Sequence, residues 1–145
     1  MKIGTISIDI GSAIMEQRQV ILNVDDNDGA RHAKSRLLAN AGFQVEEAAD
    51  GAEALAKVAE LVPVLVVLDI KLPDMNGHDV CIRIKENPAT AHVLVLQTSA
   101  AMITPADKQR GLRSGADHYL SAPFEPAELV SIVRGLLGPS SAAGE

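Results

Sequence analysis

Apolar and polar residues follow two patterns that take turns along the chain. Short runs rich in Val, Ile and Leu have the length of strands, and the segments between them repeat their apolar residues every three to four positions. The predicted strands are Val20–Val24, Phe43–Ala48, Val64–Leu68, Val93–Leu96 and Tyr119–Leu120. This alternation predicts five βα units.

Residues typical of helix ends flank the predicted helices. Asp50 and Glu53 form a capping pair at the start of one helix, and Gly42 stands just past the end of the helix before it. Pro105 and Pro126 each occupy the first position of a later helix. These signals support the helical spacing of the segments between the strands.

The apolar runs also indicate how the strands are arranged. The run "VLVVL" is typical of a parallel strand covered on both faces, whereas "FQVEEA" alternates and suits a sheet edge. Right-handed crossovers then place helices on both faces. We predict an α/β fold with a doubly wound, five-stranded parallel sheet of flavodoxin-like order 2-1-3-4-5.

Composition narrows the classes of protein. The chain has 145 residues, enough for one domain, and a net charge of -6 with no basic run, which argues against a nucleic-acid partner. No apolar run approaches the ~20 residues needed to cross a bilayer. The single cysteine, Cys81, cannot form an internal disulfide and is expected in the core. We therefore expect a cytoplasmic protein with no membrane partner.

Three carboxylates are predicted to converge at one edge of the sheet. Asp25 and Asp26 follow the first predicted strand, and Asp69 follows the third. Ligands of doubly wound sheets bind outside the carboxyl ends of the strands, where the strand order reverses. Crowded carboxylates repel one another unless a cation lies between them, and oxygen ligands suit Mg²⁺. The sequence therefore predicts a magnesium site.

Two other interpretations of these carboxylates are weaker. An EF-hand loop needs carboxylates at positions 1, 3 and 5 with Gly at 6, and no register of "NVDDNDGARHAK" provides them. Turn formation or helix capping explains Asp28. It explains neither the Asp25-Asp26 pair nor its match with Asp69.

Four segments resemble the receiver domains of bacterial-type two-component response regulators, often called CheY-like. The segments are "VDDN" (24–27), "LVVLDIKLPDMNG" (65–77), "TSA" (98–100) and "SGADHYLSAPFEPAEL" (114–129), in the family's order and spacing. The resemblance covers residues 19–138. It implies a module of two-component or phosphorelay signalling, with residues 1–18 as an N-terminal extension and 139–145 as a flexible tail. Such a module is either a stand-alone protein or a part of a longer one, such as a hybrid kinase.

The resemblance implies roles for individual residues. Asp69 would be the phosphoacceptor, which takes a phosphoryl group from a histidine kinase or a histidine phosphotransfer protein. Asp26, Asp69 and the backbone carbonyl of Lys71 would bind Mg²⁺ directly, and Asp25 would act largely through a water. Self-phosphorylation and autodephosphorylation would be the most chemistry expected, without catalytic turnover.

The resemblance also implies a switch and an output surface. Ser99 would be the switch hydroxyl, favoured over Thr98 because Ala100 follows it, and Tyr119 would be the switch aromatic. The predicted helix near Thr104–Ser114 has few apolar residues, so we expect it to be weakly held. This helix, the last strand and the last helix would form the face that binds a downstream protein or a second copy of the chain.

One position departs from the family's pattern. The family has a Lys immediately before the Pro-Phe pair, and this chain has Ala122. Either Lys71 supplies the missing positive charge, or the domain is a pseudo-receiver that binds proteins without being phosphorylated. A haloacid-dehalogenase-like phosphatase would need an Asp at the position of Lys71, so this third interpretation is set aside.

The histidines show no spacing typical of metal ligands or of phosphohistidine sites. We expect all four to be exposed to solvent: His32, His78, His92 and His118.

Overall fold

The computed structural model describes residues 19–99 and 104–138, in which strands and helices alternate. The strands are β1 (Val20–Val24), β2 (Gln44–Ala48), β3 (Leu65–Asp69), β4 (Leu94–Ser99) and β5 (His118–Ser121). The helices are α2 (Asp28–Asn40), α3 (Gly51–Leu61), α4 (Gly77–Glu86), α5 (Pro105–Arg113) and α6 (Pro126–Leu137). The predicted alternation of strand and helix is confirmed. The segments 1–18 and 139–145, interpreted above as an extension and a tail, lie outside the described residues.

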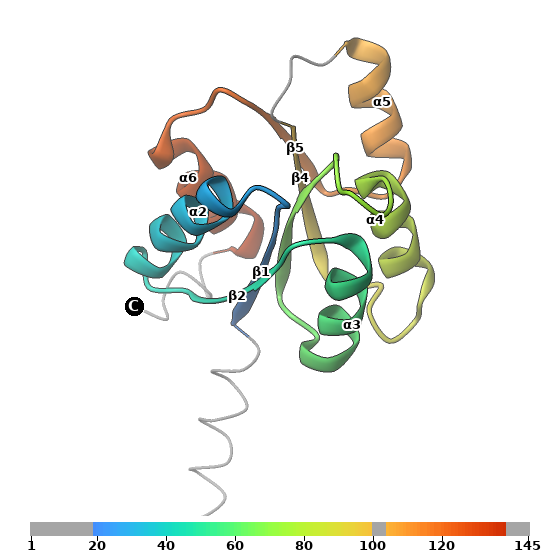
Figure 1. Cartoon of the computed structure of the whole chain (residues 1–145), viewed down its shortest axis with the longest axis horizontal. Coiled ribbons are helices and arrows are strands. Elements are labelled where there is room, and N and C mark those ends of the chain that lie inside the picture. The colour runs from blue at the N-terminus through green and yellow to red at the C-terminus, as the bar shows by residue number, and fades with distance from the viewer. Residues whose placement is uncertain (1–18, 100–103, 139–145) are drawn as a thin grey trace, which may run out of the picture.

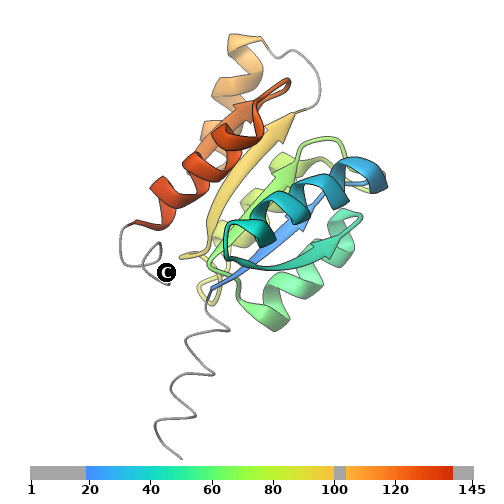
Figure 2. The same ribbon diagram turned by 90° about the vertical axis from the view of Figure 1, so that its left-hand side faces the viewer.

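The five strands form one parallel sheet in the order β2-β1-β3-β4-β5, as predicted. Helices α2 and α6 cover one face, and α3, α4 and α5 lie on the other (Figures 1 and 2). The largely apolar strands β1 and β3 are fully buried inside the sheet, whereas β2, at the edge, alternates between exposed and half-buried residues before its buried last residue. The patterns of burial therefore match the two types of run in the sequence.

Strand β3 separates two apolar clusters. Val66 and Leu68 pack in the cluster beneath α3 and α4, and Leu65 and Val67 pack in the one beneath α2 and α6. Side chains alternate between the faces of a strand, so Asp69 continues the row of Leu65 and Val67. The last residue of β3 therefore faces the α2 side of the sheet.

Several element ends differ from those predicted. Strand β4 extends past Leu96 to Ser99, because the polar residues Gln97 and Thr98 are buried in the sheet. Asn27, rather than Asp28, caps α2, since its side chain accepts a hydrogen bond from the Ala30 N–H at 2.8 Å. Asn and Asp are about equally favoured as the capping residue before a helix, so the sequence alone does not show whether Asn27 or Asp28 caps α2.

The predicted capping pair of Asp50 and Glu53 is present. The Asp50 side chain accepts a hydrogen bond from the Glu53 N–H at 2.8 Å, and the Glu53 carboxylate accepts one from the Ala49 N–H at 2.9 Å. Thr104 and Asp107 form a similar reciprocal pair at the start of α5, with both bonds at 3.1 Å.

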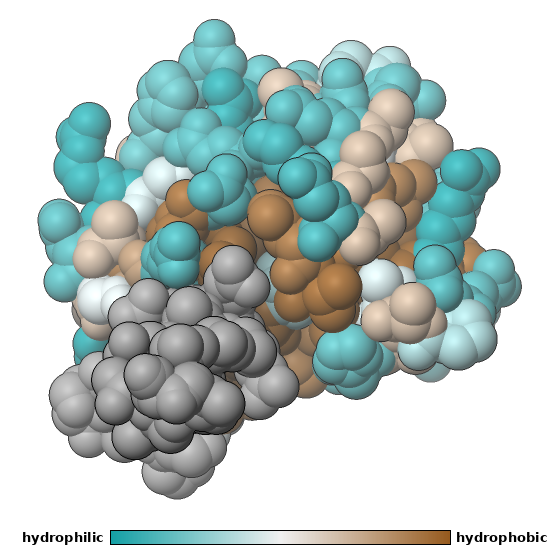
Figure 3. Space-filling model, turned by 90° about the horizontal axis from the view of Figure 1, so that it is seen from below, coloured by the Kyte–Doolittle hydropathy of each residue, from teal (hydrophilic) through white to brown (hydrophobic). Residues whose placement is uncertain are grey.

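The two ends of the sheet differ in character. At the end where the strands begin, apolar side chains gather at the centre of the surface within a ring of polar ones (Figure 3). The carboxylates lie at the other end, where the strands finish. Within residues 19–99 and 104–138, no helix has the length and hydropathy to cross a bilayer.

Candidate functional site

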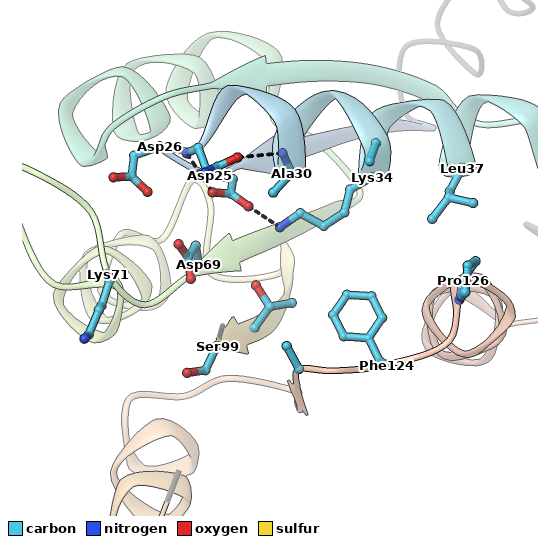
Figure 4. A pocket seen from close by; sticks show the side chains of 14 residues that line it. Asp25, Asp26, Ala30, Lys34, Leu37, Asp69, Lys71, Ser99, Phe124 and Pro126 are labelled. Atoms are coloured by element: carbon cyan, nitrogen blue, oxygen red, sulfur yellow. Dashed lines mark hydrogen bonds and ion pairs between the residues drawn. The ribbon is translucent and has the colours of Figure 1, made fainter. Parts of the chain in front are cut away.

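Three aspartates meet at the carboxyl ends of β1 and β3, as the sequence predicts. Asp25, Asp26 and Asp69 each offer one carboxylate oxygen, and these oxygens lie within 4.8 Å of one another (Figure 4). Asp25 and Asp69 are 7% and 8% exposed, whereas Asp26 is open to solvent. The cluster therefore has two buried carboxylates and one at its mouth.

The protein holds Asp25 by both its backbone and its side chain. The Asp25 carbonyl accepts a hydrogen bond from the Arg31 guanidinium at 2.8 Å, and its N–H donates to the Ala48 carbonyl at 3.1 Å. Carboxylate oxygen Oδ1 accepts from the Asn27 N–H at 2.9 Å. Asp25 is thus fixed before any cation binds.

A lysine that the sequence analysis did not single out completes the cluster. Lys34 of α2 places its Nζ 2.9 Å from Asp25 Oδ2, and its side chain is only 11% exposed. The signal for it was present, because Lys34 stands four residues after Ala30 and four before Leu38, within the apolar stripe of the helix. A lysine in such a stripe is buried toward the sheet and needs a negative partner.

Asp69 is the carboxylate whose ionisation the site disfavours most clearly. Burial and the charge of Asp25 raise its pKa from 3.8 to about 6, and Asp26 adds to this increase. The charge of Lys34 and the Ile70 N–H oppose the increase. A bound cation, or a reaction that removes the charge from the Asp69 carboxylate, relieves the repulsion between these carboxylates.

The loop between β3 and α4 folds back on Asp69. The Gly77 N–H donates to the Ile70 carbonyl at 2.7 Å, and Lys71 pairs with Asn76 in an antiparallel bridge. A Cβ at Gly77 would collide with the Asp69 carbonyl oxygen and lie 2.7 Å from Ile70 Cα. Glycine is therefore required where the helix start approaches the backbone of β3.

The loop also braces its neighbours, while its lysine points outward. Asp74 accepts hydrogen bonds from the N–H groups of Gly51 at 2.7 Å and Ala52 at 2.8 Å, which ties the loop to the start of α3. Lys71 is exposed, extends away from Asp69 (Figure 4), and forms no ion pair within residues 19–99 and 104–138.

Two hydroxyl residues end β4 beside the cluster. Thr98 lies opposite Asp69 in the sheet, and its carbonyl accepts from the Ile70 N–H at 3.1 Å. The Ser99 carbonyl accepts from the Ala122 N–H at 2.8 Å. Thr98 and Ser99 both line the cavity that contains the carboxylates, so the structure brings both near the predicted acceptor.

The cluster opens into a cavity of about 620 Å³ between α2 and the segment that joins β5 to α6. Ala33, Lys34 and Leu37 line it from α2, and Ala122, Phe124 and Pro126 line it from the other wall. Figure 4 shows the Phe124 ring beside the Lys34 side chain. The small side chain at 122 leaves this space open above Asp69.

Tyr119 is buried against α5. It is 8% exposed, and a Cβ at Gly111 would lie 2.6 Å from its ring. Burial raises the pKa of its phenol, the charge of Asp107 adds to this, and the Ser99 hydroxyl opposes it. The glycine inside α5 therefore makes room for the ring, and the phenol lies near the predicted switch serine.

The prediction that all histidines are exposed is wrong for His78, which is 6% exposed. Its place in the first turn of α4 turns the ring inward toward Gln97 of β4, and burial together with the charge of Arg110 lowers its pKa. His32, His92 and His118 are exposed, as expected. Cys81 is buried in the core, also as expected.

The donor set fits a small divalent cation. Mg²⁺ prefers oxygen ligands and is held by one or two carboxylates together with waters. Both Asp25 oxygens already have a partner, in Asn27 and Lys34, whereas Asp26 accepts no hydrogen bond from the rest of the described chain. Asp26 and Asp69 are therefore better placed than Asp25 to bind a cation directly.

Several known proteins are similar to this chain in sequence. The DNA-binding response regulator MtrA of Mycolicibacterium smegmatis is 41% identical over 120 residues, which are 83% of this chain and 51% of that protein. The DNA-binding dual master transcriptional regulator RpaA of Synechocystis is 38% identical over 117 residues, which are 81% and 48% of the two chains. The chain thus spans about half the length of these curated relatives.

Solved structures of response regulators also resemble the chain, in sequence and in fold. A protein of Chloroflexus aurantiacus described as a response regulator has a TM-score of 0.78 and 34% identity, covering 82% of this chain and 97% of its own. The chemotaxis protein CheY4 of Vibrio cholerae has a TM-score of 0.74 and 32% identity, covering 79% and 94%. Residues 21–134 match the response regulator receiver domain. The chain therefore belongs to the response regulator receiver domain family of two-component signalling.

Proposed function

We propose that Asp69 accepts a phosphoryl group from a phosphohistidine and that the modified residue changes the surface around α5. The observation that carries this proposal is the cluster of Asp25, Asp26 and Asp69 at the carboxyl ends of β1 and β3, with oxygens within 4.8 Å. Two carboxylates that serve only as turn formers or helix caps would have no reason to meet a third from another strand.

The reaction is a transfer between two nucleophiles. An Asp69 carboxylate oxygen attacks the phosphorus, the P–N bond to the donor imidazole breaks, and the imidazole nitrogen takes up a proton from solvent. An acyl phosphate remains on Asp69. Phosphoryl transfer depends mainly on in-line placement and on charges that balance the phosphoryl oxygens. The backbone of β3 holds Asp69 in position, and the loop after β3 folds back against this backbone at Gly77.

Asp26 and Asp69 would hold Mg²⁺, together with the backbone carbonyl of Lys71, and Asp25 would act through a water. When bound, the ion neutralises charge on the phosphoryl oxygens and on the carboxylates. The hydroxyl of Ser99, at the end of β4, would donate a hydrogen bond to a phosphoryl oxygen. That bond would draw the end of β4 toward Asp69.

Tyr119 is the residue through which this movement would reach the surface. Its phenol lies near Ser99 and its ring packs on Gly111, so a displaced Ser99 changes the space available to the ring beneath α5. We propose that α5, β5 and α6 form the face that a downstream protein binds. The chain as a whole has a net charge of -6 and no basic run, and for that reason a protein partner is proposed rather than a nucleic acid.

A direct test uses a small phosphodonor. The protein is incubated with phosphoramidate and Mg²⁺, and its intact mass is measured before peptides are mapped. The proposal predicts an added phosphoryl mass on the peptide that contains Asp69, absent in Asp69→Asn and after chelation of Mg²⁺. Asp79→Asn, which changes an exposed aspartate on α4, is the control and should be labelled like the natural chain. Absence of label in the natural chain would favour the pseudo-receiver alternative.

A further inference from the structure

We infer that Lys34 supplies the positive charge that the family places at position 122, so that α2 rather than the segment before α6 carries the lysine of the phosphoacceptor site. This inference rests on the proposed function of Asp69. It is carried by the position of Lys34 in the fold, by its partner and by the side chain that faces it across the cavity.

Lys34 is not placed as an ordinary surface lysine. Its side chain is 11% exposed, and its Nζ bonds to Asp25 Oδ2 at 2.9 Å. Lysine is among the residues least often buried, because removing an ammonium from water is costly unless a negative group balances it. A buried ion pair adds little stability on its own, so stability alone does not account for a lysine here. The neighbouring carboxylates account for a lysine at this position, because they balance its charge.

The chain leaves room for this side chain on the opposite wall. Lys34 and Ala122 line the same cavity of about 620 Å³, one from α2 and the other from the segment before α6. Asp69 also lines this cavity, on the face of the sheet that α2 covers. A lysine at 122 would bring a second ammonium into the space that Lys34 serves from the other side. The small residue at 122 and the buried lysine at 34 are therefore complementary.

Lys71 is the rival source of charge, and its geometry is less suitable. Its side chain is exposed and extends away from Asp69, whereas the Lys34 side chain points into the cluster (Figure 4). The Lys34 ammonium lies 2.9 Å from Asp25, a carboxylate of the same cluster as Asp69, and Lys34 lines the same cavity as Asp69.

The placement suggests how Lys34 would act. Without phosphoryl, three carboxylates face one ammonium, and Lys34 offsets the charge of Asp25. A phosphoryl group on Asp69 adds oxygens to the cavity, and a flexible lysine side chain can move its ammonium from Asp25 to one of them. The group that balances the new charge would then be attached to α2, which packs against β1 and α6.

Four variants separate Lys34 from Lys71: Lys34→Met, Lys34→Arg, Lys71→Ala and the double variant Lys34→Met with Ala122→Lys. Thermal melts first establish that each is folded. Two properties are then measured in each variant. The first is the Asp69 pKa, from carboxyl carbon chemical shifts in the absence of Mg²⁺ and phosphodonor. The second is the rate of Asp69 phosphorylation by phosphoramidate with Mg²⁺.

The inference predicts that Lys34→Met raises the measured Asp69 pKa relative to that of the natural chain, because a nearby ammonium that favours the ionised carboxylate is lost. It also predicts a phosphorylation rate lower by roughly tenfold or more, as when one charge-stabilising group is removed from an active site. Lys34→Arg should keep most of the rate, and Ala122→Lys in the double variant should restore it. Lys71→Ala keeps the backbone carbonyl and should change both properties less than Lys34→Met does.

The outcomes distinguish the inference from the function on which it rests. A natural chain that is phosphorylated, with an unchanged rate and Asp69 pKa in Lys34→Met, would overturn the inference and leave the proposed function in place. A rate lost in Lys71→Ala instead would assign the charge to Lys71 and overturn it as well. If Asp69 is phosphorylated neither in the natural chain nor in any variant, including the double variant, the proposed function fails and the inference fails with it, even where the Asp69 pKa still responds to Lys34.

Discussion

Lys34 and Ala122 line the cavity that contains Asp69, one from α2 and the other from the segment before α6, and the Lys34 ammonium lies 2.9 Å from Asp25. The two residues are 88 positions apart, as their numbers show, and are brought together because α2 and the segment before α6 cover the same face of the sheet. The site therefore has a buried positive charge although it lacks the lysine typical of the family.

Magnesium should stabilise the fold through Asp26. Because Asp26 is exposed and close to two other carboxylates, Asp26→Asn should not destabilise the metal-free protein, but it should abolish most of the increase in melting temperature that Mg²⁺ causes. At ten times the Kd, the ion adds about 1.4 kcal/mol to the natural chain. Thermal melts with and without Mg²⁺ measure this. Glu60→Gln, an exposed change on α3, is the control, and an equal response in Asp26→Asn would contradict the site.

Ionised Asp69 should cost stability at neutral pH. The pKa of Asp69 in the folded state is about 6, above the ordinary 3.8, so folding favours the protonated carboxyl group over the ionised one. Asp69 therefore does not lower the free energy of unfolding below pH 3.8, and it lowers that free energy increasingly as the pH rises through about 6. Without Mg²⁺, Asp69→Asn should exceed the natural chain in free energy of unfolding by about 1 to 3 kcal/mol at pH 7.5, because one pKa unit is worth about 1.4 kcal/mol. Urea unfolding at pH 4.5 and 7.5 tests this, and a difference that does not grow with pH would count against it.

Gly77 should be intolerant of a side chain. A Cβ there would collide with the Asp69 carbonyl, so Gly77→Ala should lower the free energy of unfolding by roughly 1 to 3 kcal/mol and should also slow phosphorylation. Gly135 in α6 is a matched control, since a Cβ there meets nothing within 4 Å. Gly135→Ala should raise stability by roughly 0.5 to 1 kcal/mol. Equal effects of the two substitutions in urea unfolding would show that the contact with Asp69 is unimportant.

His78 should make the fold sensitive to mild acid. Burial and the charge of Arg110 lower its folded-state pKa below the ordinary 6.5, so its contribution to stability is complete above pH 6.5 and is lost as the pH falls through the folded value. His78→Gln should therefore lose less stability than the natural chain between pH 7 and pH 5. The exposed His92 provides the comparison, because His92→Gln should leave the pH dependence unchanged. Parallel curves for all three proteins would refute the prediction.

Much of the fold could be predicted from residue patterns because the helices and strands bury their apolar residues in regular ways. The run "VLVVL" is buried on both faces, and the alternating "FQVEEA" lies at an edge. The convergence of Asp25, Asp26 and Asp69 followed from the same order of strands, since each residue ends a strand at the same side of the sheet.

The residues that were missed depend on which way a side chain turns. Lys34 and His78 are buried polar residues on helical faces that are otherwise apolar. His78 was expected to be exposed because its side chain is polar, and Lys34 was not singled out. Lys71 was the candidate named for the missing charge, as one of two open alternatives, because it is two residues from Asp69 in the sequence. The contact of Lys34 in α2 with Asp25 at the end of β1 is not visible in the sequence. The contact of Asp74, in the loop between β3 and α4, with the start of α3 was missed for the same reason, because the two segments are more than 20 residues apart in the sequence.

Phosphorylation of Asp69 is proposed to control Ser99 and Tyr119 although residue 122 is alanine. Beryllofluoride, a mimic of the phosphoryl group, is added with Mg²⁺ while the backbone amide signals of Ser99 and Tyr119 are followed by NMR. We expect both signals to shift in the natural chain, to shift less in Lys34→Met and to stay in place in Asp69→Asn. Signals that stay in place in the natural chain, with the mimic shown to be bound, would overturn this proposal and identify the domain as a pseudo-receiver.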